Sequence, residues 1–218
     1  MFKSIKTSVL AFILVGTAIL AHAQKKVTEG TLVYSMKYKV SAPGAPEEQK
    51  VKFNGDISKL EMEFGPAAIG VLLDTKTGAG LLLVDIPVAQ KQLASKMTKA
   101  DMDEQNAAKP KYSDFKATGE KKTIAGYNAE KYTFKDDKGG NGELWATSDI
   151  DLPVNIATSE FKEVKGTVVM VDTPMATVTL KSLTEGKVGE LSVTKIPAGY
   201  DEITYAEMKA LQQQGGGE

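Results

Sequence analysis

Apolar side chains fall on every second position in two stretches of the chain, and this period constrains the fold more than any other feature. In residues 31–40 it places on one face Leu32, Tyr34, Met36, Tyr38 and Val40. Successive side chains of a β-strand point to opposite faces, so the pattern predicts a half-buried antiparallel strand. A second strand at Val51 and Phe53 precedes a hairpin turn at residues 54–56. The strand after the turn carries a second alternating set, Leu60, Met62 and Phe64.

The next two predicted strands differ, because their apolar residues are nearly continuous. Residues 69–73 and 81–84 form such runs on either side of a polar turn. Continuous runs are typical of strands covered on both faces, so another segment must lie over this part of the sheet. The expected cover is a helix over residues 100–108, with Thr98 and Asp101 forming its N-terminal cap.

The remainder of the chain predicts short strands and one further helix. Strands are expected at residues 115–119, 130–134, 144–146, 163–171, 176–183 and 191–196. Thr204 and Glu207 form a capping box that opens a short C-terminal helix. Up to about ten strands with an uneven apolar face tend to curl. The predicted fold class is therefore mainly β with few α: a single strongly curved antiparallel sheet, a half-barrel, with one or two helices on its concave side.

The start of the chain predicts export. Lys3 and Lys6 give a positive beginning, an uncharged apolar run follows, and Ala21-His22-Ala23 fits the small-x-small pattern of signal peptidase. The apolar run is too short to span a bilayer comfortably. We expect a signal peptide over residues 1–23 with cleavage near Ala23, a single domain over 24–214, and a flexible tail over 215–218. The mature chain is expected to be periplasmic or secreted and to have no transmembrane segment.

The composition lacks residue types that several common catalytic and metal sites require. The single histidine, His22, lies in the expected signal peptide, and the chain has neither cysteine nor arginine. Serine and cysteine nucleophiles usually need an imidazole base, and zinc and copper sites usually need imidazole or thiolate ligands. Loss of Lys3 and Lys6 changes the net charge from −1 to −3, which predicts no attraction to nucleic acid. We expect a protein that is not an enzyme and uses neither a cofactor nor a metal.

Two acidic clusters have plainer interpretations than a functional site. The loop at residues 136–143 contains oxygen ligands and glycines, but its spacing departs from that of calcium loops, so we expect a solvated hairpin turn. Asp101, Asp103 and Glu104 follow a threonine cap, where carboxylates more often complement the helix N-terminus than catalyse a reaction.

Four stretches occur in an order and spacing that resemble a known family. They are residues 30–34 (GTLVY), 122–132 (KTIAGYNAEKY), 143–147 (ELWAT) and 196–200 (IPAGY). Together they resemble a family of uncharacterised exported bacterial domains of unknown function, which is similar to the LolA/LolB-like lipoprotein carriers of the periplasm. The resemblance covers nearly the whole mature chain and implies a half-barrel whose apolar concavity lies under helices. Those carriers generally hold their lid with an arginine, which this chain lacks, so the resemblance implies passive binding rather than lipoprotein shuttling.

The candidate ligand-binding site is the apolar face of the predicted strands. Its expected residues are Tyr34, Met36, Tyr38, Leu60, Met62, Phe64, Tyr132, Phe134 and Trp145. Methionine and aromatic side chains make adaptable surfaces for acyl chains. The same alternating residues also suit an ordinary packed core, and the sequence does not distinguish the two.

Two hypotheses of function follow. The first, which we predict, is a non-enzymatic periplasmic binding protein with an apolar concave groove for a lipid, an acyl chain or a lipidated partner. The alternative is a structural or protein-interaction module of the cell envelope with a filled core and no small ligand. Such a module would bind another envelope protein, either by pairing a strand at its sheet edge or through contacts of its surface.

Overall fold

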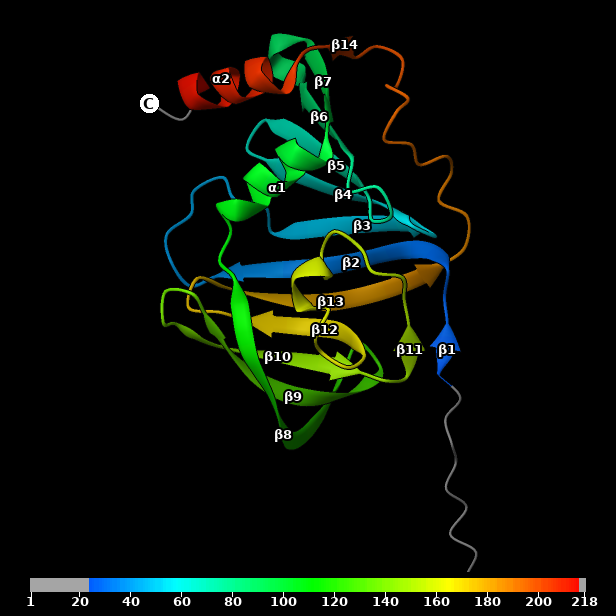
Figure 1. The fold of residues 1–218 in the computed structure, drawn as a ribbon, viewed down its shortest axis with the longest axis vertical. Helices are drawn as coiled ribbons and strands as arrows, with labels where there is room; N and C mark the ends of the chain where they lie inside the picture. The colour runs from blue at the N-terminus through cyan, green and yellow to red at the C-terminus, as the bar shows by residue number, and fades with distance from the viewer. Residues whose placement is uncertain (1–23, 216–218) are drawn as a thin grey trace, which may run out of the picture.

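In the computed structural model, which describes residues 24–215, the chain folds into one large sheet and two α-helices (Figure 1). The helices are α1, Lys99–Ala107, and α2, Tyr205–Gly215; two 3-10 turns are η1, Pro87–Ala89, and η2, Ser159–Phe161. The predicted signal peptide and the last three residues of the predicted tail lie outside the described residues. Within the described range, no helix is long and apolar enough to cross a membrane.

The strands follow one another along the chain with mostly short connections. Their bounds are β1 Lys25–Lys26, β2 Glu29–Tyr38, β3 Glu48–Asn54, β4 Ile57–Phe64, β5 Ala67–Asp74, β6 Gly80–Ile86, β7 Lys91–Met97, β8 Tyr112–Ile124, β9 Tyr127–Asp136, β10 Asn141–Thr147, β11 Ile150–Asp151, β12 Thr167–Asp172, β13 Ala176–Glu185 and β14 Asp201–Glu202.

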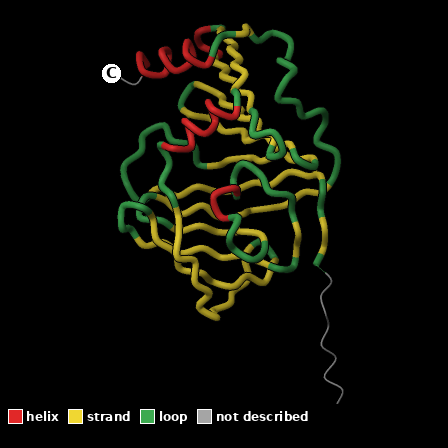
Figure 2. The backbone as a smooth tube through the Cα atoms, viewed as in Figure 1, coloured by secondary structure: helices red, strands yellow, loops and turns green. Residues whose placement is uncertain are grey.

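Twelve of these strands form the large sheet, in the order β14-β7-β6-β5-β4-β3-β2-β13-β12-β10-β9-β8. Neighbours are antiparallel except β14, which pairs with β7 in parallel over two residues. β1 and β11 pair separately, also in parallel. The terminal strands β14 and β8 do not pair with each other, so the sheet curves without closing, as the trace in Figure 2 shows. The predicted fold class is confirmed.

The concave face is apolar along whole rows of paired residues. Leu32 pairs with Val51, Val51 with Leu60, Leu60 with Val71, and Val71 with Leu82. Paired residues of neighbouring strands share a face. One apolar row therefore crosses five strands, and it begins with the alternating residues that the sequence pattern identifies.

Strands β5 and β6 are covered on both faces, as their continuous apolar runs predict. On the concave face Leu82 packs with Met102 of α1 and Met208 of α2. On the convex face Leu81 packs with Val193, which belongs to the loop before α2. The predicted helical cover is confirmed for the concave face. The convex cover is a loop that sequence periodicity did not indicate.

The predicted strand over residues 191–196 is wrong. The segment is a loop in which Ser192 Oγ accepts hydrogen bonds from the backbone N–H groups of Thr194 at 3.3 Å and Lys195 at 3.1 Å. A side chain that bonds the local backbone competes with a sheet ladder. Val193 is nevertheless buried, because it packs on the convex face.

The strand predicted over residues 163–171 begins only at Thr167. Gly166 has φ +99°, and a Cβ at this position would lie 2.5 Å from the carbonyl oxygen of Thr147. Left-handed backbone of this kind ends a regular strand and favours glycine. The preceding residues instead form η2 and a turn, from which Phe161 and Val164 are buried against the sheet.

Both predicted helix caps are confirmed. The N–H of Asp101 donates to Thr98 Oγ1 at 3.2 Å, and the Asp101 carboxylate accepts from the N–H of Thr98 at 2.8 Å. In α2 the N–H of Glu207 donates to Thr204 Oγ1 at 3.2 Å, and Glu207 Oε2 accepts from the N–H of Thr204 at 2.8 Å. The hydrogen bonds from Thr98 hold the pKa of Asp101 below its usual value. Asp101 is thus a capping residue, in line with its interpretation from sequence.

Candidate functional site

All but one of the predicted site residues lie on the concave face. The register joins distant parts of the chain there, because Met36 pairs with Val178, Val178 with Val171, Val171 with Leu144, and Leu144 with Tyr132. This second row runs from β2 to β9 and is apolar throughout. The sheet therefore places the two predicted halves of the site on one face, with β13, β12 and β10 between β2 and β9, although residues 65–131 separate them in sequence.

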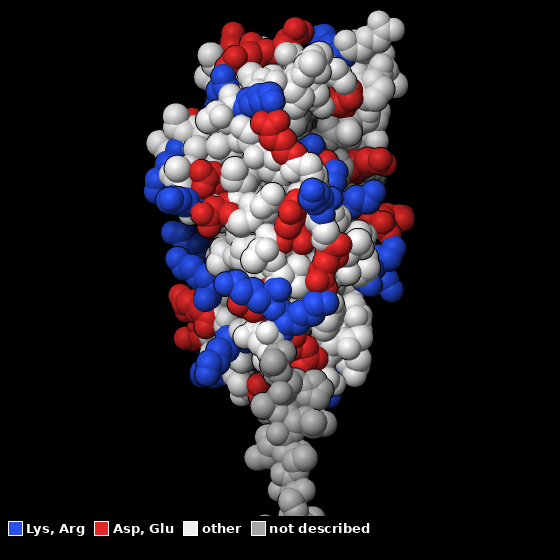
Figure 3. Space-filling model, turned by 90° about the vertical axis from the view of Figure 1, so that its right-hand side faces the viewer, with Lys and Arg blue, Asp and Glu red and all other residues white. Residues whose placement is uncertain are grey.

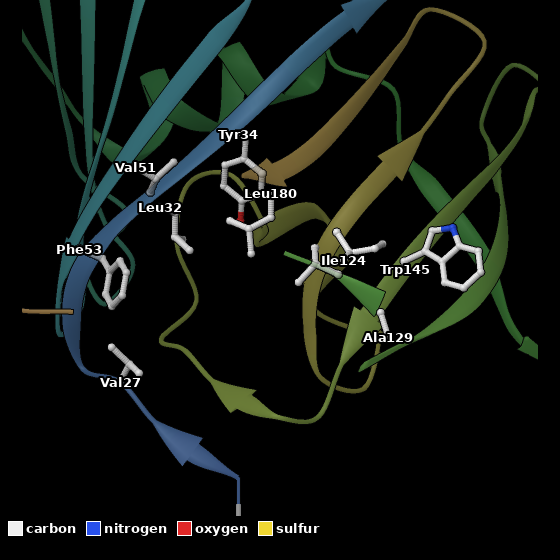
Figure 4. Packing of buried hydrophobic residues seen from close by; sticks show 10 residues of the cluster. Val27, Leu32, Tyr34, Val51, Phe53, Ile124, Ala129, Trp145 and Leu180 are labelled. Carbon is white, nitrogen blue, oxygen red and sulfur yellow. The ribbon is translucent and has the colours of Figure 1, made fainter. Parts of the chain in front are cut away.

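Trp145 is the exception and lies on the convex face. It pairs with Met170, whereas its neighbour Leu144 packs on the concave side. Lys122 Nζ lies 4.0 Å from the centroid of the indole ring and 3.3 Å from Met170 Sδ. Figure 4 shows the indole pointing away from Tyr34. Trp145 therefore points away from the face of the other predicted site residues, although it belongs to the same buried cluster as Tyr34, and a cation–π contact with Lys122 covers its ring.

Burial decreases along the concave face toward the end of β2. Leu32 is fully buried and Tyr34 is 4% exposed, whereas the next two apolar residues of this face are half-buried. Burial decreases in the same way along β4, where the last residue, Phe64, is 50% exposed. We refer to the incompletely covered residues Met36, Tyr38, Met62 and Phe64 as the apolar strip; they lie on β2 and β4, with Gln49 of β3 between the two strands on the same face.

Phe134 and Leu60 belong to filled parts of the concave side. The Phe134 ring centroid lies 5.0 Å from that of Tyr112, 5.8 Å from Phe115 and 6.0 Å from Phe161. Phe161 belongs to η2, so this aromatic cluster holds the segment around η2 against the sheet. Leu60 packs against the central buried cluster. In this structure both residues act as core.

Three parts of the chain cover the concave face: α1, α2 and residues 152–164, which we call the central cover (Figure 1). Met102 is the buried side chain of α1. Burying one methionine contributes about 1.5–3 kcal/mol, so α1 is held weakly. The central cover is held more firmly, because it buries Phe161 and Val164.

Polar contacts join these covers to one another and to the sheet. Lys209 of α2 forms an ion pair with Glu104 of α1. Lys109, which follows α1, lies 3.6 Å from Glu160 of the central cover. The N–H of Ile156 donates to the buried Ser58 Oγ at 3.0 Å. The ion pairs are exposed and contribute little to stability, so they orient the covers more than they hold them.

Two open clefts contain many polar residues, and they lie on different faces of the sheet. One of about 640 Å³ is lined by Tyr132 together with Lys121, Glu130 and Asp149. The other, of about 710 Å³, lies mainly on the convex face, because its lining includes Glu61 and Leu83, which share a row with Gly70. The apolar strip is therefore a partly open surface of the concave face that neither cleft contains as a whole.

Glu61 lies at the centre of an ion-pair network in the larger cleft. Its carboxylate lies 2.9 Å from Lys52 Nζ and 2.8 Å from Lys59 Nζ. Partial burial pushes the pKa of Glu61 up, but hydrogen bonds from these two ammonium groups outweigh it and hold the pKa below its usual value. The Lys59 side chain packs over Gly70, where a Cβ would lie only 3.2 Å from Lys59 Cε, so a larger residue at this position would crowd it.

The Glu61→Gln variant is expected to lose about 1 kcal/mol of stability near neutral pH. A carboxyl with a lowered folded-state pKa stabilises the protein above its unfolded pKa, near 4.5 here, and that contribution is lost as pH falls through the folded pKa. Urea unfolding of both proteins between pH 7 and about pH 3 should therefore show the difference shrinking in acid. A difference that is constant with pH would contradict this role, and Lys59→Met should reproduce part of the effect.

The acidic loop between β9 and β10 is a turn. Asp136 Oδ1 accepts hydrogen bonds from the N–H of Lys138 at 2.9 Å and of Gly140 at 2.7 Å. These bonds use the carboxylate inside the turn, and the predicted hairpin is confirmed. In the part of the chain that the structure describes, no group of three or more His, Cys, Asp or Glu residues could hold a metal ion.

Surface charges of both signs are interspersed on the side of the molecule shown in Figure 3. In the described chain, charges of opposite sign also pair, as Lys195 does with Glu190 at 2.8 Å and Lys96 with Glu202 at 2.9 Å. A mixed surface creates no broad field of one sign.

Solved structures resemble this chain only in fold. PNGF-II in space group P21 has a TM-score of 0.52 and 17% identity, over 84% of this chain and 33% of that one. PNGF-II in space group C2 has a TM-score of 0.50 and 16% identity, and the match covers 84% of this chain and 32% of that one. The Mycobacterium tuberculosis lipoprotein LppX has a TM-score of 0.41 and 11% identity, and the match covers 75% of this chain and 90% of that one. The chain spans about a third of the length of the PNGF-II structures that it matches.

Family comparison gives a more specific result. No curated protein sequence matches the chain. One family model does match, that of the domain of unknown function DUF4412, over residues 33–160. The match starts in β2 and ends in η2, so it includes the apolar strip and most of the central cover. This chain belongs to the DUF4412 family.

Proposed function

We propose that this protein is an exported, non-enzymatic binding protein that takes an apolar ligand on the concave side of its sheet. The ligand would be a lipid, an acyl chain or the acyl group of a lipidated partner. The observation that carries the proposal is the apolar strip, in which Phe64 is 50% exposed and its neighbours are only half covered. Exposed apolar surface that is continuous with a core is typical of binding sites.

The covers of the concave face support this proposal. α1 depends on the single buried side chain of Met102, so its displacement exposes little additional apolar surface. Methionines also line the space between the helices and the sheet, namely Met97, Met102 and Met208. Flexible, polarisable methionine side chains adapt to ligands of different shape. A chain entering along the strip would thus meet a cover that yields at low cost.

Export is part of the same proposal. The supporting features are the positive start, the uncharged run and the small-x-small pattern at residues 21–23, all in the sequence. A chain without cysteine forms no disulfides in an oxidising compartment, so its fold must rest on the hydrophobic core. The proposed location is the periplasm or the exterior of the cell.

The alternative function, an envelope interaction module with a filled core, is favoured by the aromatic cluster around Phe161. Pairing through a sheet edge fits the structure less well. The edge strand β8 has two register shifts, Asp114 has φ +57°, and exposed lysines such as Lys116 and Lys121 line it. Irregularities and lysines of this kind disfavour the addition of a further strand. Such a module would act through its side-chain surface.

The test is ligand binding by the mature chain. We expect native mass spectrometry of gently purified protein to show copurified lipid. We also expect the delipidated protein to raise the fluorescence of N-phenyl-naphthylamine, a neutral apolar probe, in a saturable titration. A protein that carries no lipid and gives no saturable signal would refute the binding proposal. A stable complex recovered from envelope extracts would then favour the interaction module.

A further inference from the structure

Two buried hydroxyls on the concave face lack a hydrogen-bond partner. In the described residues, the buried side-chain polar atoms without a partner are Tyr34 Oη and Ser95 Oγ. Ser95 pairs with Leu82, so it shares the concave face with Tyr34. Native proteins rarely leave a buried hydroxyl unpaired, because the group has given up its bonds to water. Each such atom therefore calls for an acceptor that the protein itself does not supply.

Tyr34 lies at the inner end of the apolar strip. It is two residues from Met36 on the same face of β2 and is 4% exposed. Its hydroxyl points between Leu32 and Leu180 into the buried cluster (Figure 4). Gln49 opposes Tyr34 in the register, yet it makes no bond to the hydroxyl. An unpaired donor thus lies in the buried cluster, next to the inner end of the strip.

The surroundings of this donor contain no charge. The buried residues of the described chain include no Lys, Asp or Glu, and the full sequence has no Arg. Burial alone raises the pKa of Tyr34, so the phenol stays protonated and remains a donor. A free carboxylate at this depth would be buried without a cation, which is strongly unfavourable. A neutral carbonyl oxygen accepts one hydrogen bond from a phenol without that cost.

We infer that the ligand is an ester-linked acyl group whose neutral carbonyl oxygen accepts a hydrogen bond from the Tyr34 hydroxyl. This inference rests on the proposed function and specifies its ligand. The acyl chain lies along the strip past Met36 and Met62, and the ester reaches Tyr34. Acylglycerols and the diacylglyceryl group of lipidated proteins both contain this chemistry.

The experiment compares ligands that differ at one functional group. Delipidated protein carrying N-phenyl-naphthylamine is titrated with methyl palmitate, palmitate and hexadecane. The parent protein should bind methyl palmitate about tenfold more tightly than hexadecane, the value of one good hydrogen bond in an apolar site. It should discriminate at least as strongly against palmitate. In Tyr34→Phe the preference for the ester over hexadecane should disappear, while hexadecane binding is retained.

Ser95→Ala is the matched control, because it removes the other unpaired hydroxyl, which lies under the helices. It should keep the ester preference. Ligand-free Tyr34→Phe should also melt about 2–4 °C higher than the parent, because it loses an unpaired polar group and no packing. An unchanged ester preference in Tyr34→Phe, or a lower melting temperature, would overturn the inference.

The outcomes separate this inference from the proposed function. Equal binding of the ester and hexadecane by the parent leaves the apolar site intact and rejects the role of Tyr34. Failure to bind any of the three ligands rejects both. Titration with monopalmitoylglycerol and with a dipalmitoyl-glyceryl-cysteine peptide then distinguishes the source, since tighter binding of the peptide identifies a lipidated protein as the ligand.

Discussion

Truncation of Phe161 to alanine is expected to lower the free energy of unfolding by about 3–5 kcal/mol. The ring is 7% exposed, and its centroid lies 5.3 Å from that of Tyr112 and 6.3 Å from that of Phe115. Its removal leaves a cavity between the central cover and the sheet, which the remaining rigid rings cannot fill. Urea unfolding followed by the fluorescence of Trp145, the single tryptophan, measures the loss.

Phe64→Ala is the matched control, because the same atoms are removed from a ring that is 50% exposed. It should cost less than about 1 kcal/mol. Hydrogen exchange adds a second readout: the backbone amides of residues 152–164 should lose protection in Phe161→Ala and keep it in Phe64→Ala. Similar losses of stability in the two variants would show that Phe161 does not anchor the central cover.

Placing a carboxylate in the apolar strip is expected to weaken binding of N-phenyl-naphthylamine at least about 100-fold. The Met62→Glu variant makes this change on the concave face of β4, where the side chain is half-buried. An apolar ligand bound on this surface would have to displace water from the new carboxylate without supplying a hydrogen-bond partner for that charge. Partial exposure of the site lets the free protein keep the carboxylate hydrated, so the fold should persist.

Met170→Glu provides the control on the opposite face. Met170 is also half-buried, but it pairs with Trp145 on the convex side and lies 3.3 Å from Lys122 Nζ. The Met170→Glu variant should bind N-phenyl-naphthylamine with the affinity of the parent protein. Circular dichroism and the melting temperature verify that both variants are folded. If Met62→Glu binds normally, or if both variants lose binding equally, the concave strip is not the binding surface.

Local features of the fold follow from the sequence because their causes are local. The alternation in residues 31–40 gives β2, and the glycine turn at residues 54–56 gives the β3–β4 hairpin. The capping boxes at Thr98 and Thr204 open α1 and α2 within one helical turn of their own residues. Each of these features needs only neighbours in sequence, so the pattern is sufficient.

Strand β7 shows where this reasoning stops. Its sequence, KQLASKM, lacks a clean two-residue period, because Ala94 packs on the convex face while Ser95 is buried on the concave one. No strand was predicted there. Both positions are buried because α1, α2 and the C-terminal loop lie over the two faces of β7, and those segments are distant in sequence. Burial of this kind comes from the tertiary structure.

The assignment of Trp145 has a similar cause. Residues 144–146, Leu-Trp-Ala, are all apolar, so hydrophobicity cannot tell which of them faces the concavity. The register with β9 and β12 decides it, and Leu144 takes the concave side. A shift by one residue exchanges the two faces of a strand, and only the pairing fixes that choice.

The sequence by itself determined that the chain forms a curved antiparallel sheet and that Tyr34, Met36, Tyr38, Leu60, Met62 and Phe64 share one face of it, because side chains alternate along every strand. Tertiary structure alone decided which residues of that face stay open. Phe161 and Met102 bring their covers over Phe134 and Leu82 and leave Phe64 half-exposed. Coverage depends on where distant segments pack, and a pattern confined to one strand carries no information about that.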